Sequence, residues 1–494
     1  MTPQTKTTKN LHEIKTIVDD SDKKVHSIHA LYASFTTTKL KKHLGSFKEK
    51  GFSVTATLFD LLIMTITNKS VRMYVGGDSS DAAKDTYYRL KNEPRVDWRM
   101  VMFLFVNRFL SLVNKASTDD SDEPRCLIID DTSCFKRGKF IEGISKVFDH
   151  VFHRYCLGFK GLIMGYCDSR SFIPVDFSLH NEKGKRPEKP FGLKPEELNR
   201  QFTKERQPDC PGFTRETERR VSKSENTIAM IKRALRHRLT VDYILVDSWF
   251  MNLGLIAYVY TLKSTYLLGM CKFDDRKYIF NGKEKTVKQL LDWCKRNKRI
   301  KRSRTIKARY AELIVEYKGY TMKLFFSQFN DRSWNALLTD NRAMTFAEAI
   351  KIYTKRWSIE VFFKETKQHL GLGKDQSRDF DGQIASFTCV FLVYIMVSLR
   401  RRFSAYESMG DLFRKTQSEI LETTLTERLW GLFIELQHSI LQVMGISFDD
   451  LIQMMLCNNQ VEERMIGILT DMKSWSQHQS SETPIHLPEY QWLN

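Results

Sequence analysis

The spacing of apolar positions divides the chain into three kinds of pattern. Up to about residue 120, apolar residues recur at helical intervals, for example over residues 54–67, which predicts an all-α region. From about residue 125 the apolar runs shorten to strand length, and beyond about residue 383 helical patterns return. An α/β core between two helical flanks is therefore expected.

Two of the strand-like runs end in aspartate. Residues 126–129 (CLII) lead into Asp130 and Asp131, and residues 243–246 (YILV) lead into Asp247. Buried strands of this kind can bring their last residues to one edge of a sheet. The doublet leaves an alternative open, because neighbouring residues on a strand face opposite sides and only one of them can join such a site.

The segments between and after these strands differ in character. Residues 181–224 are polar and basic and hold five of the eleven prolines, which predicts a long loop or lid that is too polar to bury. It is either a surface insertion or a DNA-contacting segment. Residues 265–341 alternate β-like runs with basic turns such as 295–304, which predicts a β-rich insertion. Residues 345–370 show one long helical pattern.

Within that long helical pattern, polar side chains share one face. At roughly 100° per residue, Tyr353, Arg356, Glu360 and Lys367 fall in a stripe about 60° wide. An adjacent apolar stripe would dock the helix on a core and leave Glu360 at its edge. The alternative is an exposed face with ordinary salt-bridge spacing.

The charge balance points to a polyanionic partner. Lys and Arg number 78 against 59 Asp and Glu, a formal net charge of +19, so nucleic acid is favoured, although a basic surface also serves solubility. The nine cysteines show no zinc-ligand spacing and are expected to be reduced thiols.

Neither a membrane nor an export pathway is expected from the sequence. The N-terminus has no apolar stretch of the secretory type. The apolar residues 385–399 fall short of the roughly 20 residues that a bilayer span needs, so a buried core helix is predicted there.

Three carboxylates at one edge of a sheet repel one another unless a cation lies among them. Hard oxygen ligands select Mg²⁺ or Mn²⁺ over zinc. Two such ions about 4 Å apart can activate a water or a 3′-hydroxyl and stabilise the leaving oxygen of a phosphodiester. The pattern therefore predicts phosphoryl transfer on DNA or RNA.

The same residues resemble a known family. Tyr353, Arg356, Glu360 and Lys367 reproduce Y-x2-R-x3-E-x6-K, the YREK signature of a large group of bacterial insertion-sequence transposases. The surrounding run IYTKRWSIEVFFKETKQHLG is similar to the corresponding segment of cut-and-paste DDE transposases. Asp131 in IDDTS resembles their first-aspartate motif, and Asp247 in LVDSWF resembles the second. The resemblance covers roughly residues 120–400.

This resemblance implies a ribonuclease-H-like core with a β-strand insertion, and roles for individual residues. Asp131, Asp247 and Glu360 would be the catalytic ligands of two Mg²⁺ (or Mn²⁺) ions, with Asp131 preferred over Asp130 because its D-T pair matches better. The residues expected to contact transposon-end DNA are Tyr353, Arg356 and Lys367, to which we add Lys364 of the same helix.

Two further candidate DNA contacts lie outside that helix. Trp334, in the insertion, would stack on a flipped base as in relatives that form a DNA hairpin, or would simply belong to the core. Ser248 after Asp247 departs from those relatives and puts the hairpin step in doubt. In the N-terminal region, residues 79–81 can cap a short helix over 82–91, whose Tyr87 and Arg89 would lie on a basic, aromatic surface. Such a helix suits a DNA reader or is ordinary amphipathic structure.

The expected protein is a DNA transposase that binds inverted-repeat ends, cleaves them and joins the 3′-hydroxyl ends to target DNA. It would act on double-stranded DNA as a homodimer in a paired-end complex, in the bacterial cytoplasm at the nucleoid. The expected regions are 1–120 (all-α, DNA-binding), 121–260 (first part of the catalytic core), 261–342 (β-rich insertion), 343–400 (second part of the core) and 401–494 (helical, suited to dimerisation). The alternatives are a ribonuclease-H-like structure-specific endonuclease and a non-catalytic DNA-binding protein derived from a transposase.

Overall fold

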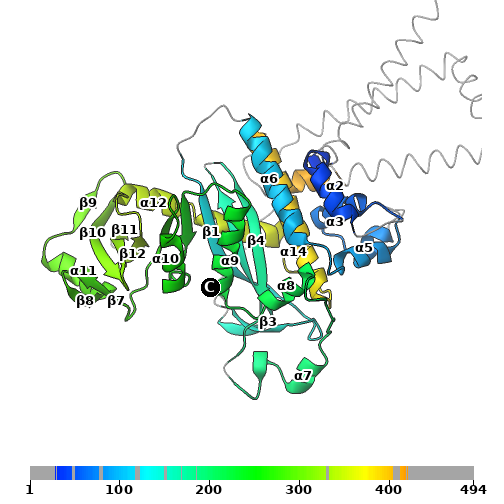
Figure 1. The fold of residues 1–494 in the computed structure, drawn as a ribbon, viewed down its shortest axis with the longest axis horizontal. Coiled ribbons are helices and arrows are strands. Elements are labelled where there is room, and N and C mark those ends of the chain that lie inside the picture. The colour runs from blue at the N-terminus through cyan, green and yellow to red at the C-terminus, as the bar shows by residue number, and fades with distance from the viewer. Residues whose placement is uncertain are drawn as a thin grey trace, which may run out of the picture. The chain divides into compact units, whose positions relative to one another are not determined.

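Strands and helices from distant parts of the chain build the fold in Figure 1. The computed structural model describes residues 28, 31–46, 51–76, 82–116, 123–149, 153–168, 170–184, 186–329, 333–403, 412–418 and 420. All of them except residue 420 belong to one unit, Ile28–Ser418, and only this unit is described below. The predicted helix cap at 79–81 and nearly all of the predicted dimerisation region, 401–494, lie outside the described residues.

The core strands belong to a 12-stranded mixed sheet. They are β1 (Cys126–Phe135), β2 (Ser145–Asp149), β3 (Arg154–Cys167), β4 (Phe172–His180), β5 (Tyr243–Val246) and β6 (Tyr266–Met270). β3 lies antiparallel between β1 and β4, while β5 and β6 continue the sheet from β1 in parallel. β2 pairs with the first part of β3. This mixed sheet is consistent with the predicted ribonuclease-H-like core and confirms the fold class.

The helices form the N-terminal part and cover the sheet. They are α2 (Thr38–Gly45), α3 (Val54–Ile66), α4 (Val71–Val75), α5 (Lys84–Lys91), α6 (Trp98–Ala116), α7 (Pro195–Asn199), α8 (Pro211–Glu218), α9 (Lys223–Arg236), α10 (Leu253–Tyr260), α11 (Val287–Arg296), α12 (Phe346–Thr354), α13 (Trp357–His369) and α14 (Phe380–Phe403), with the 3₁₀ turn η1 (Pro190–Gly192). The N-terminal helices confirm the predicted helical flank on that side.

Helices lie on both faces of the core sheet. On β4, Phe177 packs against Phe391 of α14, and the neighbouring Asp176 accepts a hydrogen bond from Arg233 of α9. Because adjacent side chains on a strand point to opposite faces, α14 and α9 cover opposite sides. By length and composition α14 could span a bilayer, but 94% of its apolar window is buried in the fold. It is the buried core helix that the sequence predicts.

The β-rich insertion is continuous with the core sheet. It contains β7 (Lys277–Phe280), β8 (Lys283–Thr286), β9 (Lys301–Ser303), β10 (Ala308–Tyr317), β11 (Tyr320–Phe329) and β12 (Asn335–Thr339), together with α11. β12 pairs antiparallel with β6, so β6 joins the insertion to the core. In Figure 1 the insertion lies on one side of the core, and α6 and α14 lie on the other.

The helical pattern expected over residues 345–370 is confirmed, although a short turn at Lys355 and Arg356 divides it into α12 and α13. The amides of Lys355 and Arg356 donate to the carbonyls of Ile352 and Tyr353, three residues back rather than four. Lys355 and Arg356 keep right-handed helical backbone angles, and Arg356, the N-cap residue of α13, donates to Asp130 on β1.

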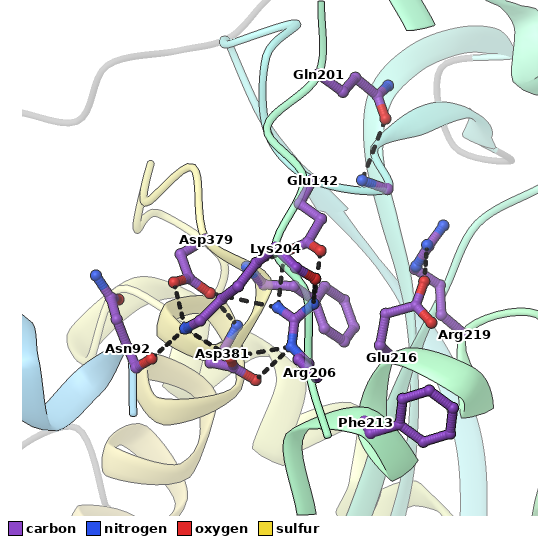
Figure 2. A network of polar contacts seen from close by, with 12 residues as sticks. Asn92, Glu142, Gln201, Lys204, Arg206, Phe213, Glu216, Arg219, Asp379 and Asp381 are labelled. Carbon is purple, nitrogen blue, oxygen red and sulfur yellow. Dashed lines mark hydrogen bonds and ion pairs between the residues drawn. The ribbon is translucent and has the colours of Figure 1, made fainter. Parts of the chain in front are cut away.

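Most of residues 181–224 are exposed or half-buried, as expected of a polar segment, but a few of its charged side chains are buried. Arg206 is almost fully buried and forms ion pairs with Glu142 and Asp381 at 2.7 and 3.1 Å (Figure 2). Lys204 beside it donates to Asp379 at 2.8 Å and to Asp381 at 3.0 Å. Charges can be buried when they are paired and hydrogen-bonded, so these pairs fix the segment against the start of α14 and the loop after β1.

A second buried ion cluster ties the same segment to β4. Burial alone would raise the pKa of Asp176, but the charges of Arg99, Arg233 and Arg215 lower it to about 2. Glu218 of α8 shares Arg99 at 2.6 Å. The guanidinium groups of Arg99, Arg215 and Arg233 thus form ion pairs with the carboxylates of Asp176 and Glu218. These ion pairs connect α6, α8 and α9 to β4 at one edge of the sheet.

Removing Arg206 should destabilise the fold strongly. Arg206→Ala leaves the buried carboxylates of Glu142 and Asp381 without their main partner, and breaking a buried pair in this way costs about 3–5 kcal/mol. Urea denaturation followed by tryptophan fluorescence measures the change in the free energy of unfolding. Arg95→Ala, which removes an exposed partner of Glu93, should leave the midpoint unchanged. Equal midpoints for the two variants would contradict this account of the network.

Candidate active site

Two neighbouring strands bring Asp130 and Asp247 side by side, although only Asp247 follows the end of its strand, as predicted, whereas Asp130 lies in the middle of β1. β1 and β5 are parallel neighbours in which Ile129 stands opposite Val246, so the residues that follow, Asp130 and Asp247, continue side by side. After β5, the Asp247 carboxylate accepts hydrogen bonds from the amides of Trp249 at 2.8 Å and Phe250 at 3.2 Å. These bonds fix the carboxylate at the end of the strand.

Asp130 and Asp131 face opposite sides of β1. Asp130 accepts a hydrogen bond at 2.8 Å from Arg356, the N-cap residue of α13, whereas Asp131 forms an ion pair with Lys223 at the start of α9. Thr132, two residues beyond Asp130, accepts a bond from Lys367 of α13 at 2.6 Å, as the alternation of a strand requires. This placement runs against the choice of Asp131, because the helix that carries Glu360 lies on the face of Asp130.

Despite the break between α12 and α13, the residues of the YREK signature meet at β1 and β5. Arg356 lies between Asp130 and Glu360 and pairs with both carboxylates. Lys367 reaches Thr132, and the Tyr353 hydroxyl donates to the carbonyl of Val246 at 3.4 Å. The apolar residues of the adjacent stripe are buried, as expected: Ile352, Ile359, Phe363 and Leu370.

Burial and neighbouring charges shift the pKa values of two side chains at this site, Asp130 and Tyr353. Burial raises the pKa of Asp130 to about 7 against the opposing effect of Arg356, and the charge of Asp247 adds to the rise. Burial also raises the pKa of Tyr353 to about 12, so its phenol stays protonated at neutral pH. Asp130 therefore depends on a nearby cation to remain ionised.

The donor atoms at this edge suit a hard cation, but the carboxylates are not gathered around one point. Among the described residues, no group of three or more His, Cys, Asp or Glu side chains is arranged as a metal site. Arg356 lies between two of the three acids. The ligand set itself, carboxylate oxygens from Asp130, Asp247 and Glu360, is the kind that Mg²⁺ and Mn²⁺ prefer.

The N-terminal candidate surface needs a correction. Tyr87 is fully buried and its hydroxyl donates to Asp60 at 2.7 Å, so it belongs to the helical core rather than to an exposed DNA-reading face. Lys91 is buried too and pairs with Asp375. The helical spacing predicted that these side chains share one face of the helix. The structure shows that α5 packs against α3 and α14, and this packing buries Tyr87 and Lys91. Arg89 remains exposed.

The other predicted DNA contacts lie apart from the carboxylates. Lys364 is exposed on α13. Trp334 is half-buried just before β12 in the insertion, with the Lys295 ammonium 5.9 Å from its ring centre. Neither residue contacts the three acids through any interaction among the described residues.

Sequence reasoning missed two residues next to the site, Lys223 and Trp249. Lys223 pairs with Asp131, and its ammonium lies 4.4 Å from the centre of the Trp249 ring. Trp249 is 45% exposed, although it follows Asp247 by only two residues. A tryptophan two residues after a strand-terminal aspartate was the available signal, whereas Lys223 could be found only from the fold.

Two family models match the chain. Residues 215–396 match a model described as "Transposase DDE domain", and residues 42–270 match one described as "DDE superfamily endonuclease". The first match includes Asp247 and Glu360, and the second includes Asp130, Asp131 and Asp247. No curated protein matches the chain. The two matches support a DDE-superfamily transposase or endonuclease that acts on DNA.

A double-mutant cycle should detect the contact between Asp130 and Arg356. Both side chains are less than 20% exposed, so the unfolding free energies of Asp130→Ala, Arg356→Ala and the double variant should reveal a coupling of roughly 1–3 kcal/mol. The matched cycle of Asp131→Ala with Arg356→Ala should give less than about 0.5 kcal/mol, because that pair lies on opposite faces of β1. A larger coupling for Asp131 than for Asp130 would reverse the assignment of faces.

Proposed function

We propose that the protein is a DNA transposase that cleaves the ends of its element and joins their 3′-hydroxyls to target DNA. The observation that carries this proposal is the position of Asp130 beside Asp247 on neighbouring strands, with Arg356 linking Asp130 to Glu360. The matches to DDE domains and the net positive charge of +19 support it.

Asp130, Asp247 and Glu360 would be the metal ligands, with Asp130 in the role that the sequence analysis gave to Asp131. The reason is that Asp130 shares Arg356 with Glu360, while Asp131 pairs with Lys223. Two Mg²⁺ or Mn²⁺ ions, when bound, would activate the attacking oxygen and stabilise the leaving oxygen of a phosphodiester.

The cations of α13 would handle the DNA backbone. Arg356 now donates one hydrogen bond to Asp130 and one to Glu360, and two oxygens of a single phosphate would accept both bonds. Arg356 could therefore pass from Asp130 and Glu360 to a phosphate near the scissile bond and leave the acids free to bind metal. Lys367 would hold a second phosphate, and the protonated Tyr353 hydroxyl would donate to a phosphate oxygen.

The finer features of the reaction belong to the same proposal. We propose that the protein recognises the inverted repeats of an insertion sequence and pairs two ends as a homodimer. Trp334 would stack on a base that is turned out of the duplex. Lys364 and Arg89, both exposed, would add contacts to the DNA backbone.

A structure-specific endonuclease is the second candidate, because one matching family model is described as an endonuclease. Such an enzyme would use the same carboxylates for hydrolysis without strand transfer. Incubation of the purified protein, Mg²⁺, end DNA and a target plasmid distinguishes the two functions. Covalent joining of an end to the plasmid supports the transposase, whereas cleavage without joining supports the endonuclease.

Substitution of single acids should separate Asp130 from Asp131. Asp130→Asn, Asp247→Asn and Glu360→Gln should each reduce end cleavage by about a thousandfold or more, because each removes a charge needed in the transition state. Asp131→Asn is the matched control and should retain most of the activity. Loss of cleavage in Asp131→Asn with activity retained in Asp130→Asn would overturn the assignment. Unchanged cleavage in Asp247→Asn would point instead to a non-catalytic DNA-binding protein.

Removing the Lys367 charge should weaken end binding in a salt-dependent manner. For Lys367→Ala, the slope of log affinity against log salt should become shallower by about 1, since one phosphate contact is lost. Lys139→Ala removes an exposed cation that pairs with Glu197 and serves as the control. Fluorescence anisotropy with labelled end DNA measures both slopes, and identical slopes would argue against the role of Lys367.

A further inference from the structure

The insertion carries the densest run of positive charge in the described part of the chain. Of the fifteen residues 295–309, nine are Lys or Arg and none is Asp or Glu. All nine side chains are exposed. We call these nine side chains the basic surface. They contribute nine positive charges to a chain whose formal net charge is +19.

The backbone keeps these charges close together. The segment runs from the end of α11 through β9 into β10, and β9 pairs with β10 alone. In that pairing Arg302 stands directly opposite Arg309. Like charges directly opposite each other on neighbouring strands repel, so the hairpin holds this arrangement at a cost to its own stability.

The protein's own carboxylates neutralise only part of the basic surface. Lys295 lies 3.7 Å from Asp292, and Lys301 lies 3.4 Å from Glu312. Glu312 is shared with Lys323 at 3.2 Å. Five of the nine cations form neither a salt bridge nor a side-chain hydrogen bond with any described residue, namely Lys298, Arg299, Arg302, Arg304 and Lys307. An external polyanion would provide the missing countercharge.

The basic surface begins at the end of the sheet where the candidate active site lies. Lys295 stands over Trp334, which immediately precedes β12. β12 is antiparallel to β6, and β6 is parallel to β5, so the start of β12 lies at the end of β5 that carries Asp247. Two strand spacings and about three residues of strand separate Trp334 from Asp247, or roughly 15 Å. A duplex covers that distance in about four base pairs.

We propose that the basic surface binds the phosphate backbone of duplex DNA that continues past the active site. The contact would be independent of sequence, because contacts to phosphate carry no sequence information. It rests on the proposed function only in taking DNA as the polyanion. Its role is to extend the grip on the duplex beyond the residues of α13.

A charge-removal series with a matched control tests this surface. The variant Arg299→Gln/Arg302→Gln/Arg304→Gln removes three cations that lack a salt bridge among the described residues. The control removes three other exposed cations of the insertion, as Lys283→Gln/Lys288→Gln/Lys318→Gln. Both full-length variants carry the same net charge, and circular dichroism checks that both fold.

The measurement is the binding of a random-sequence duplex of about 40 base pairs, roughly four helical turns, over a range of salt concentrations without divalent metal. For the basic-surface variant, the slope of log affinity against log salt should fall by about 3, with binding at least about tenfold weaker near physiological salt. The control variant should behave as the unmodified protein. Equal slopes for the two variants would overturn the proposal and leave the basic surface as a solvated face.

The outcome is independent of catalysis. If the slope falls in the basic-surface variant while no cleavage of any end DNA is found, the inference stands and the proposed function fails. If ends are cleaved while the slope of that variant is unchanged, the proposed function stands and the inference fails.

Discussion

Asp130 and Asp247 stand side by side on adjacent parallel strands, and the repulsion between these two carboxylates is the constraint on which the site depends. Burial intensifies it, because a low-dielectric environment strengthens the interaction of charges. In this structure Arg356 relieves it by pairing with Asp130 and Glu360 together. Arg356 lies in the turn between α12 and α13. The positions of Arg356, Asp130 and Glu360 therefore depend on one another, so that moving any one of these side chains changes the contacts of the other two.

Buried ion pairs hold the frame around this arrangement. Arg206 and Lys204 join a polar segment to the start of α14, and Asp176 collects three guanidinium groups around the edge of β4. The buried cations of these clusters are therefore paired with carboxylates. The positive excess is carried on the outside, and the basic surface of the insertion holds a large part of it. Buried ion pairs thus stabilise the fold, while exposed cations remain available to bind a polyanion.

Much of the fold and part of the site could be predicted from local sequence. Apolar runs ending in aspartate located β1 and β5, and residue spacing identified the side chains of α12 and α13 that meet there. What could not be predicted depends on partners distant in the chain. The choice between Asp130 and Asp131 requires knowing which face of β1 carries α13. Lys204 pairs with Asp379, which lies 175 residues away in the sequence. The local sequence around Lys204 therefore gives no indication that this side chain is held in an ion pair. The residues around Tyr87 have the composition of a surface helix. Only the tertiary packing shows that the Tyr87 side chain is buried.

The central claim is that Asp130, Asp247 and Glu360 hold the catalytic metal on the α13 face of the sheet. Anomalous diffraction from crystals of the protein with end DNA and Mn²⁺ tests it most directly. The account predicts an anomalous peak coordinated by Asp130 and Asp247, with Arg356 turned from the carboxylates to a phosphate. A peak coordinated by Asp131 beside Lys223, or Arg356 still pairing Asp130 with Glu360 in the metal-bound complex, would contradict it.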